Sequence, residues 1–329
     1  MSLDVAPLDP VIAHFIALAQ ERLGHLDLAA LGIAELRRQS DELGNEIFRE
    51  VAEPGPEVAS VTDLDAGGVK VKLYRPPSEG PHGLYVVLHG GGWWQGSIED
   101  WISDVQARER CVGADCVVAM VEYGLAPEHP FPAGLEDSFT AFTWLQDHAA
   151  ELGCDPERIV LGGVSAGGNL AGALTLLLRD RGHRQPALTV YEAAPLDMST
   201  DYASCREYGT GYGIEIAAFE QILTMYLPNA EDRTSPLASP VRAESLDGLG
   251  PAHFMTGECD PLRDLSDAYA ARLAETGVAV TSSRFAGQIH TSPVMTKVLP
   301  AARAWRDEVN DVVSRVTRAG AAVSSEVPA

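Results

Sequence analysis

A serine at position 165 stands in a setting that can make its hydroxyl a nucleophile. It lies in a Gly-Val-Ser-Ala-Gly sequence, between a predicted strand, Ile159–Leu161, and a predicted helix, Ala166–Arg181. So tight a turn strains the serine backbone, and the glycines on either side of it supply the room that the turn needs. The start of the helix directs backbone N–H groups toward developing negative charge. A glycine-rich turn without a catalytic role is the alternative interpretation.

A glycine run follows another predicted strand, Leu84–Leu88. The sequence there is His-Gly-Gly-Gly-Trp-Trp, beginning at His89. A backbone without side chains can approach a substrate closely, and its N–H groups can stabilise an oxyanion. A flexible loop is the alternative, whereas the absence of the phosphate-loop glycine patterns disfavours a nucleotide site. We expect His89 to brace this loop, and Trp93 and Trp94 either to line a pocket or to pack in the core.

A serine nucleophile needs a histidine base and an acid. In strand–turn–helix sites of this kind the chain order is serine, acid, histidine. Of the nine histidines, only His183, His253 and His290 follow Ser165. The first lies at the exposed end of a predicted helix and the second within a predicted strand. His290 lies in a loop after a predicted strand, where such residues converge, and is the expected base.

Two aspartates could orient this histidine. Asp260 lies in a Cys-Asp-Pro turn after a predicted strand, and Pro261 keeps it out of helical geometry. Asp264 lies in the first turn of the next predicted helix, where its charge would complement the helix dipole. We therefore expect Asp260 to be the acid. The sequence has no His-Glu-x-x-His and no Cys or His clusters at ligand spacing, so we expect neither a metal nor another cofactor.

The elements that must position these residues alternate along the chain. After a predicted pair of strands, Val58–Thr62 and Val69–Tyr74, short apolar strands alternate with helices. The strands are predicted at Leu84–Leu88, Cys116–Val121, Ile159–Leu161, Leu188–Tyr191, Ala252–Thr256 and Val278–Phe285. The helices are predicted at Ile102–Val112, Leu135–Leu152, Ala166–Arg181, Asp264–Thr276 and Ala301–Thr317. This order predicts an α/β fold with a largely parallel sheet covered on both faces.

Three segments lie outside this alternation. Val11–Leu23 and Ile33–Val51 have the apolar spacing of amphipathic helices. Met198–Leu249 is a long insertion that contains a helical stretch, Glu215–Tyr226, and insertions of this length are usually lids or binding loops. We expect this insertion to cover the apolar faces of the amino-terminal helices. The tail at 319–329 consists mostly of small and polar residues and is expected to be flexible.

Composition restricts the class of protein. The chain of 329 residues is 46% hydrophobic and 22% charged, as in soluble globular proteins. It has neither a signal-like start nor an apolar run near ~20 residues, so we expect a cytoplasmic protein without a stable membrane anchor. Its net charge of −23 disfavours nucleic acid and anionic lipid surfaces as partners. The five cysteines are odd in number and form no Cys-x-x-Cys, which predicts buried, reduced thiols.

Four motifs occur in order before His290. They are His-Gly-Gly-Gly at 89–92, Tyr-Gly-Leu-Ala-Pro-Glu-His-Pro-Phe-Pro-Ala at 123–133, Gly-Val-Ser-Ala-Gly-Gly-Asn-Leu-Ala at 163–171 and Asp-Pro-Leu-Arg-Asp at 260–264. Over residues 84–291 the chain resembles the bacterial hormone-sensitive-lipase-type esterases, a branch of the α/β-hydrolases. The resemblance implies a triad of Ser165, Asp260 and His290. It also implies an oxyanion hole from the backbone N–H groups of Gly90, Gly91 and Ala166.

The resemblance also implies a helical cap over the pocket. Residues 1–50 would be its amino-terminal part, and 51–318 the hydrolase core, with a cap insert at about 198–249. Three positions depart from the family pattern, which usually has Asp at position 164, Arg at position 124 and His-Gly-Phe from position 290. Val164, Gly124 and His-Thr-Ser stand there instead, and no triad member is lost.

These residues predict a serine carboxylic-ester hydrolase that acts on short- to medium-chain or other small-molecule esters. One alternative is an acyl-transfer, cyclisation or elimination enzyme of a biosynthetic pathway, which would have to exclude water. The other is a non-catalytic small-molecule receptor, but such relatives typically lack the histidine that is present here at position 290. A homodimer stays open as an expectation.

Overall fold

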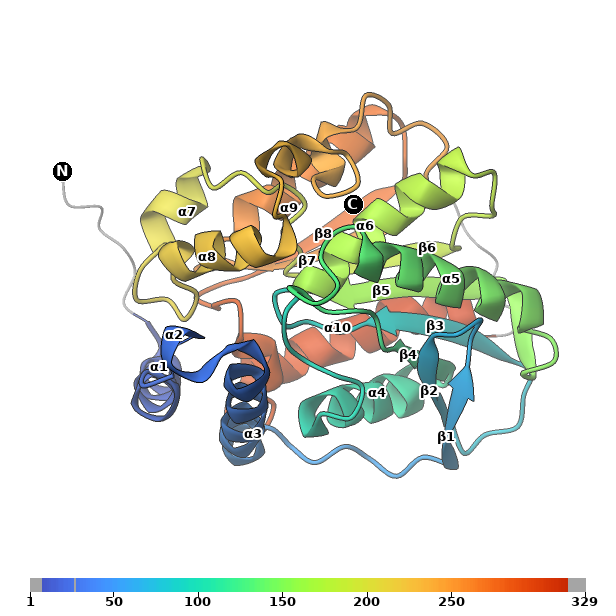
Figure 1. The fold of residues 1–329 in the computed structure, drawn as a ribbon. Coiled ribbons are helices and arrows are strands. Elements are labelled where there is room, and N and C mark those ends of the chain that lie inside the picture. Colours follow the sequence, from blue (N-terminus) through green and yellow to red (C-terminus); the bar gives the residue numbers. More distant parts are fainter. Residues whose placement is uncertain (1–7, 27, 319–329) are drawn as a thin grey trace.

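The computed structural model describes residues 8–26 and 28–318, and an eight-stranded sheet forms its centre. The strands are β1 (Ser60–Asp65), β2 (Lys70–Arg75), β3 (His82–Leu88), β4 (Val117–Val121), β5 (Cys154–Val164), β6 (Leu188–Glu192), β7 (Ala252–Gly257) and β8 (Val280–Phe285). Their order is β1-β2-β4-β3-β5-β6-β7-β8 (Figure 1). Only β2 pairs antiparallel with its neighbours, β1 and β4, so the predicted largely parallel sheet is confirmed.

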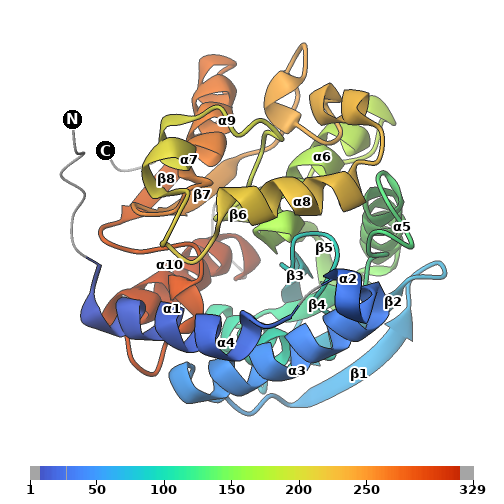
Figure 2. The ribbon, with the colours of Figure 1, turned by 60° about the vertical axis from the view of Figure 1, so that its left-hand side comes forward.

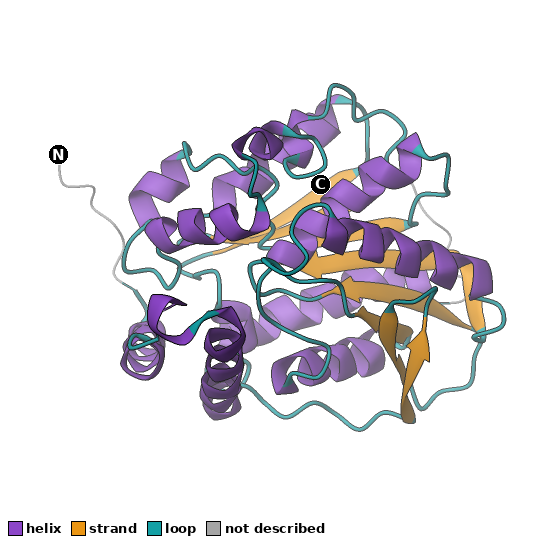
Figure 3. Ribbon diagram, viewed as in Figure 1, coloured by secondary structure: helices purple, strands orange, loops and turns teal. Residues whose placement is uncertain are grey.

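Helices cover both faces of this sheet (Figure 3). They are α4 (Trp101–Ala114), α5 (Ala133–His148), α6 (Ala166–Asp180), α9 (Arg263–Glu275) and α10 (Pro300–Thr317). Alternate residues of β3 belong to different clusters because strand side chains point to opposite faces. Leu84 and Val86 pack in the cluster that contains α5, α6 and α9, whereas Tyr85 and Val87 pack in the cluster that contains α4 and α10.

The predicted elements differ from the observed ones mainly at their ends. The first strand was predicted at Val58–Thr62 but occupies Ser60–Asp65, because its register is set by antiparallel pairing with β2. The fifth strand is longer than the predicted Ile159–Leu161, since it pairs with β3 on one side and β6 on the other. All five cysteines are buried and unpaired, as predicted. In the part of the chain that the structure describes, no helix is long and apolar enough to cross a membrane. The tail at 319–329, predicted to be flexible, lies outside the described residues.

Three helices precede the sheet. They are α1 (Pro10–Leu23), α2 (Leu28–Leu31) and α3 (Ile33–Val51), and α1 and α3 lie side by side (Figure 2). Their buried side chains form one cluster, from Ile12 and Phe15 of α1 to Ile47 and Val51 of α3. The insertion supplies only Tyr208 and Tyr212 to this cluster. The remaining members are core residues, Cys259, Ile289, Val294, Met295, Leu299 and Ala302. The expectation that the insertion covers these helices is therefore only partly met.

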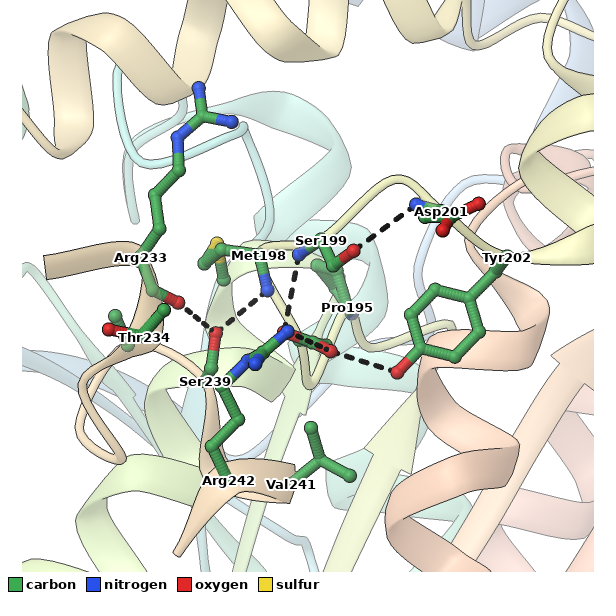
Figure 4. A network of polar contacts seen from close by, with 12 residues as sticks. Pro195, Met198, Ser199, Asp201, Tyr202, Arg233, Thr234, Ser239, Val241 and Arg242 are labelled. Carbon is green, nitrogen blue, oxygen red and sulfur yellow. Dashed lines mark hydrogen bonds and ion pairs between the residues drawn. The ribbon is translucent and has the colours of Figure 1, made fainter. Parts of the chain in front are cut away.

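The long insertion contains α7 (Ala203–Tyr208), α8 (Ile216–Tyr226) and two short 3-10 helices, Ala230–Thr234 and Pro240–Arg242. A polar network joins its beginning to its end (Figure 4). The buried carboxylate of Asp197 accepts hydrogen bonds from Arg242 at 2.8 and 3.1 Å and from the Tyr202 hydroxyl at 2.9 Å. The Ser239 hydroxyl accepts the N–H of Met198 at 2.8 Å and donates to a backbone carbonyl at 2.7 Å. The two ends of the insertion therefore meet at one place.

This network should contribute measurably to stability. Arg242→Ala would remove two hydrogen bonds and the ion pair from the buried Asp197, so we expect the free energy of unfolding to fall by about 1–3 kcal/mol. Arg206→Ala is the matched control, because its ion pair with Asp201 lies on the surface of the same insertion and should contribute about 0.5 kcal/mol or less. Chemical denaturation of both variants gives the comparison. Equal losses would show that the network is not what holds the insertion.

Candidate active site

Ser165 occupies a sharp turn between β5 and α6. Its φ is +53° and its ψ is −118°, which is strained for a residue with a side chain. The turn is packed so tightly that neither of its glycines has room for a side chain. A Cβ on Gly163 would lie 2.2 Å from the Gly167 carbonyl oxygen, and a Cβ on Gly167 would lie 2.1 Å from the Leu88 carbonyl oxygen at the end of β3. The N–H of Ser165 donates to the carbonyl of Glu192 at the end of β6, at 2.8 Å. The strands on both sides therefore fix the serine in place.

A chain of two hydrogen bonds links this serine to His290 and Asp260. His290 Nε2 lies 2.9 Å from Ser165 Oγ, and His290 Nδ1 lies 2.8 Å from Asp260 Oδ2. The other carboxylate oxygen of Asp260 accepts the N–H of Leu262 at 2.8 Å. Asp260 is fully buried. Because a carboxylate only accepts, Nδ1 carries the ring proton, and Nε2 is left to accept a proton from the serine.

The alternative acid, Asp264, lies elsewhere. It is in the first turn of α9, and its carboxylate accepts the N–H of Ser204 at 2.8 Å and Nε of Arg263 at 2.9 Å. Burial works to raise the pKa of Asp264, but these two hydrogen bonds outweigh it and the pKa is lowered. This carboxylate joins α9 to α7 in the insertion, whereas Asp260 is the aspartate that bonds His290.

The other histidines have partners of their own. In β7, His253 contacts Thr281 through Nδ1 at 2.7 Å and Glu308 through Nε2 at 3.2 Å. His183, which follows α6, is exposed and meets the ring of Phe139 edge-on. Neither is linked to the serine.

His89 lies under the glycine run. Its ring stacks on Tyr123 with the centroids 4.2 Å apart, and Nδ1 lies 2.7 Å from the Gly90 carbonyl oxygen. The Tyr123 hydroxyl donates to the His89 carbonyl at 2.7 Å. Burial lowers the pKa of His89, which favours the neutral ring. These contacts brace the loop, as expected from the sequence.

The predicted oxyanion donors lie around the serine. A Cβ on Gly90 would be 3.7 Å from Ser165 Cβ, so the backbone of Gly90 passes directly beside the nucleophile. Gly91 follows with a φ of +123°. Ala166 is the first residue of α6, and an N–H in the first turn of a helix has no partner within that helix. The backbone of Gly90 and the start of α6 thus both adjoin Ser165.

The two tryptophans after the glycine run have different environments. Trp93 is buried in the core and stacks on Tyr226 of α8, with ring centroids 4.6 Å apart. Trp94 is half-buried, and its carbonyl accepts Nε of Arg37 at 2.6 Å. Core packing is therefore the observed role of Trp93, and its stacking joins the glycine loop to the insertion.

Two features near the serine were not predicted at the level of residues, although the resemblance implied that the insertion forms part of a cap over the pocket. The first is contact of the insertion with the glycine run and with the loop that carries His290. A Cβ on Gly92 would lie 3.4 Å from Ile222 of α8, and a Cβ on Gly213 would lie 3.2 Å from Ile289, next to His290. The glycine-rich stretch at 209–213 is the only sequence signal for this contact. Ile222 of α8 and Gly213 of this stretch thus lie against the glycine run and the histidine loop, respectively.

The second missed feature is a buried ion pair behind the serine turn. The carboxylate of Glu192 accepts Nη2 of Arg110 at 2.7 and 2.9 Å and Nε1 of Trp305 at 2.8 Å. Both charged side chains are almost fully buried. A charged residue at the end of an apolar strand was the available signal. The pair anchors the strand whose carbonyl receives the N–H of Ser165.

The described residues contain no group of three or more His, Cys, Asp or Glu that could hold a metal ion. The arrangement of Ser165, His290 and Asp260 instead suits covalent catalysis by a hydroxyl, in which the histidine moves a proton and the aspartate orients the histidine.

Comparisons with known proteins agree with this chemistry. Residues 85–293 match a family model described as alpha/beta hydrolase fold. The chain is 35% identical to an arylesterase of Saccharolobus solfataricus over 86% of its own length and 92% of the relative's. It is 33% identical to carboxylesterase NlhH of Mycobacterium tuberculosis (strain ATCC 25618 / H37Rv) over 92% and 90% of the two chains. An ester hydrolase from the metagenome of Lake Arreo, solved with a bipyridine phosphonate derivative, superposes with a TM-score of 0.86 at 33% identity, covering 94% of this chain and 98% of that one.

The close passage of Gly167 past β3 should make this position intolerant of any side chain. In Gly167→Ala the new Cβ would overlap the Leu88 carbonyl, so we expect the free energy of unfolding to fall by about 3 kcal/mol or more. Gly44→Ala is the control, since the nearest atom to its new Cβ is 3.9 Å away and alanine stabilises a helix interior by about 0.5–1 kcal/mol. Thermal unfolding measures both. Similar stability in the two variants would contradict the proposed constraint.

Proposed function

Since this chain belongs to the hormone-sensitive-lipase-type esterases of the α/β-hydrolase superfamily, we propose that Ser165, His290 and Asp260 are the triad of a serine carboxylesterase. The observation that carries this assignment is the unbroken chain of hydrogen bonds from Ser165 Oγ through both ring nitrogens of His290 to a buried carboxylate. Ester hydrolysis itself is the activity of the family. The assignment of residues to steps is our proposal.

In the first half of the reaction, Ser165 Oγ attacks the ester carbonyl carbon while its proton passes to His290 Nε2. Asp260 stabilises the resulting imidazolium through the hydrogen bond to Nδ1. The carbonyl oxygen becomes an oxyanion, and the N–H groups of Gly90, Gly91 and Ala166 are its proposed donors. His290 then returns the proton to the leaving alcohol oxygen as the bond between carbon and that oxygen breaks. The product is an acyl group on Ser165.

In the second half, a water molecule replaces the alcohol. His290 Nε2 accepts one water proton as the water oxygen attacks the acyl carbon, and the same donors stabilise the second oxyanion. The proton is then delivered to Ser165 Oγ as the acyl–serine bond breaks, which releases the carboxylic acid. No cofactor takes part in this sequence of steps.

The substrate is proposed to be a short- to medium-chain or other small-molecule ester. Ile222 and Gly213 of the insertion lie against the loops that carry the oxyanion donors and His290, which limits the space above Ser165. We propose that residues 1–50 and 198–249 form one cap over the 51–318 core. The similarity to an arylesterase and a carboxylesterase supports small esters as substrates. Dimer formation and cytoplasmic localisation stay predictions from the sequence.

Replacement of the nucleophile tests the proposal directly. Ser165→Ala should lower the hydrolysis of p-nitrophenyl butyrate by roughly 10⁴-fold or more, because the nucleophile and its base act as a unit. An unchanged thermal unfolding curve is the control for folding. A phosphonate that modifies the wild-type protein stoichiometrically should leave the variant unmodified. Substantial turnover by the folded variant would disprove the assignment.

The two neighbouring aspartates allow a matched comparison. Asp260→Asn should lower kcat by roughly 10³-fold or more, since an amide cannot hold His290 in the required tautomer. Asp264→Asn removes a carboxylate that instead bonds Ser204 and Arg263, so it should alter stability more than kcat. Rates are compared per active site, after titration with a phosphonate. If the losses are reversed, Asp260 is not the acid.

A further inference from the structure

The amino-terminal helix α3 has two different faces. Its apolar side chains, including Ile47 and Val51, pack in the cluster shared with α1. Arg37, Asp41 and Asn45 recur at every fourth position and therefore lie along one other face of the helix. All three bond to the segment that follows the glycine run, although this segment lies about fifty residues further along the chain.

Arg37 holds the first part of this segment. Its Nε donates to the Trp94 carbonyl at 2.6 Å, and its Nη2 donates to the Ala126 carbonyl at 2.9 Å. Glu128 pairs with the same guanidinium at 3.1 and 2.7 Å and fixes its plane. The Trp94 carbonyl belongs to a tight turn, because the N–H groups of Trp94 and Gln95 both donate to the Gly91 carbonyl, at 3.2 and 3.0 Å. Fixing this carbonyl therefore restrains Gly91.

Asp41 holds the other end of the turn. The backbone N–H of Gly96 interacts with its carboxylate and lowers the pKa of that carboxylate. Gly96 packs directly on the glycine run: a Cβ there would lie 2.6 Å from the Gly90 carbonyl oxygen and 3.0 Å from Nδ1 of His89. A displacement of Gly96 would therefore also displace the backbone of Gly90.

Asn45 completes the set one turn further along α3. Its side-chain nitrogen lies 3.2 Å from Oδ1 of Asp100, whose other oxygen accepts the N–H of Ser97 at 2.9 Å. Its side-chain oxygen accepts the N–H of Ile102 at 3.4 Å. The backbone from Trp94 to Ile102 is thus held along its length by one face of α3.

We infer that Arg37 and Asp41 are positioning residues that hold the backbone N–H groups of Gly90 and Gly91 where the oxyanion forms. This inference rests on the proposed function, because it assigns a purpose to the oxyanion donors. Neither side chain touches the substrate. They act through the turn at 91–96, on the side of the loop that faces α3. His89 and Tyr123 support the same loop from the side of the protein core.

The electrostatics of Asp41 are consistent with a functional placement. Burial raises its pKa to about 6, assisted by the negative charges of Asp100 and Glu122, and opposed by the Gly96 hydrogen bond and by Arg37. A carboxylate is thus kept at a place where ionisation is disfavoured. An apolar residue would avoid that cost but would leave the N–H of Gly96 without its acceptor.

The test uses the full chain and the substrate p-nitrophenyl butyrate. Arg37→Ala should lower kcat per titrated active site roughly 10-fold or more while KM changes less than about 3-fold, since oxyanion donors act in the transition state. Arg38→Ala is the matched control, because Arg38 is exposed and pairs only with Glu35 and Glu42 of its own helix; it should leave kcat unchanged. Millimolar guanidinium chloride should partly restore Arg37→Ala, and sodium chloride should not.

Asp41 supplies a second, independent pair of variants. Asp41→Asn keeps an oxygen that can accept the N–H of Gly96, whereas Asp41→Leu removes it at similar size. We expect Asp41→Asn to retain most of the wild-type kcat and Asp41→Leu to lose it. This pair of variants also tests the positioning role if Arg37→Ala does not fold.

Different results would disprove the proposed function and the positioning role of Arg37 and Asp41. If the wild-type protein is not modified by a phosphonate, or if Ser165→Ala keeps its turnover, the proposed function fails. If the wild type is modified but every folded Arg37 and Asp41 variant keeps the wild-type kcat per titrated site, the positioning role is overturned. A fall in the titratable fraction alone, with normal kcat for the remaining sites, shows a merely structural role and also overturns the inference.

Discussion

A close backbone approach between Gly167 and the end of β3 sets the distance between the serine turn and the glycine run. With no Cβ on Gly163 or Gly167, α6 can start directly against β3, and Gly90 comes to lie beside Ser165. The parallel strands then bring the other loops to the same edge, because their carboxyl ends all point that way. Asp260 follows β7 and His290 follows β8, so three loops far apart in sequence meet at the serine.

Polar side chains hold the loops at this edge of the sheet from three sides. Behind the serine, the charge of the buried Glu192 is paired with Arg110, and the indole N–H of Trp305 donates to the same carboxylate. A buried ion pair of this kind adds little net stability against an apolar alternative, but it is strongly unfavourable to break, so it favours one arrangement of β6 over others. Under the glycine run lies the neutral ring of His89, and outside it lies α3. Each support is polar and directional, whereas apolar packing alone would allow the loops to slide.

The sequence predicted the local parts of this structure well and the long-range parts poorly. Ser165, Asp260 and His290 could be chosen because each follows a short apolar strand, and the structure places them in hydrogen-bond contact. The amphipathic pattern of Ile33–Val51 showed that one face is buried, but its partner is α1 together with the core segment from Ile289 to Ala302, more than the insertion that we expected. Its polar face gave no signal, because a helix with charges at every fourth position reads as solvated. Contacts with Trp94 and Gly96 depend on tertiary structure that no local pattern encodes.

The meeting of the two ends of the insertion at Asp197 has a consequence for how such a chain can diversify. Since Asp197 and Arg242 close a loop at its base, the number of residues between them can change with only a slow, logarithmic cost in chain entropy. Asn169 of α6 donates to the carbonyls of Pro195 and Ala238, on either side of that closure, at 2.9 and 2.8 Å. The base of the insertion is thus joined to the nucleophile helix, while its outer part is held by separate contacts, such as Tyr226 on Trp93 and Ser204 with Asp264. Changes of length or sequence between these contacts can therefore leave the base of the insertion and the loops of Ser165, Asp260 and His290 in place.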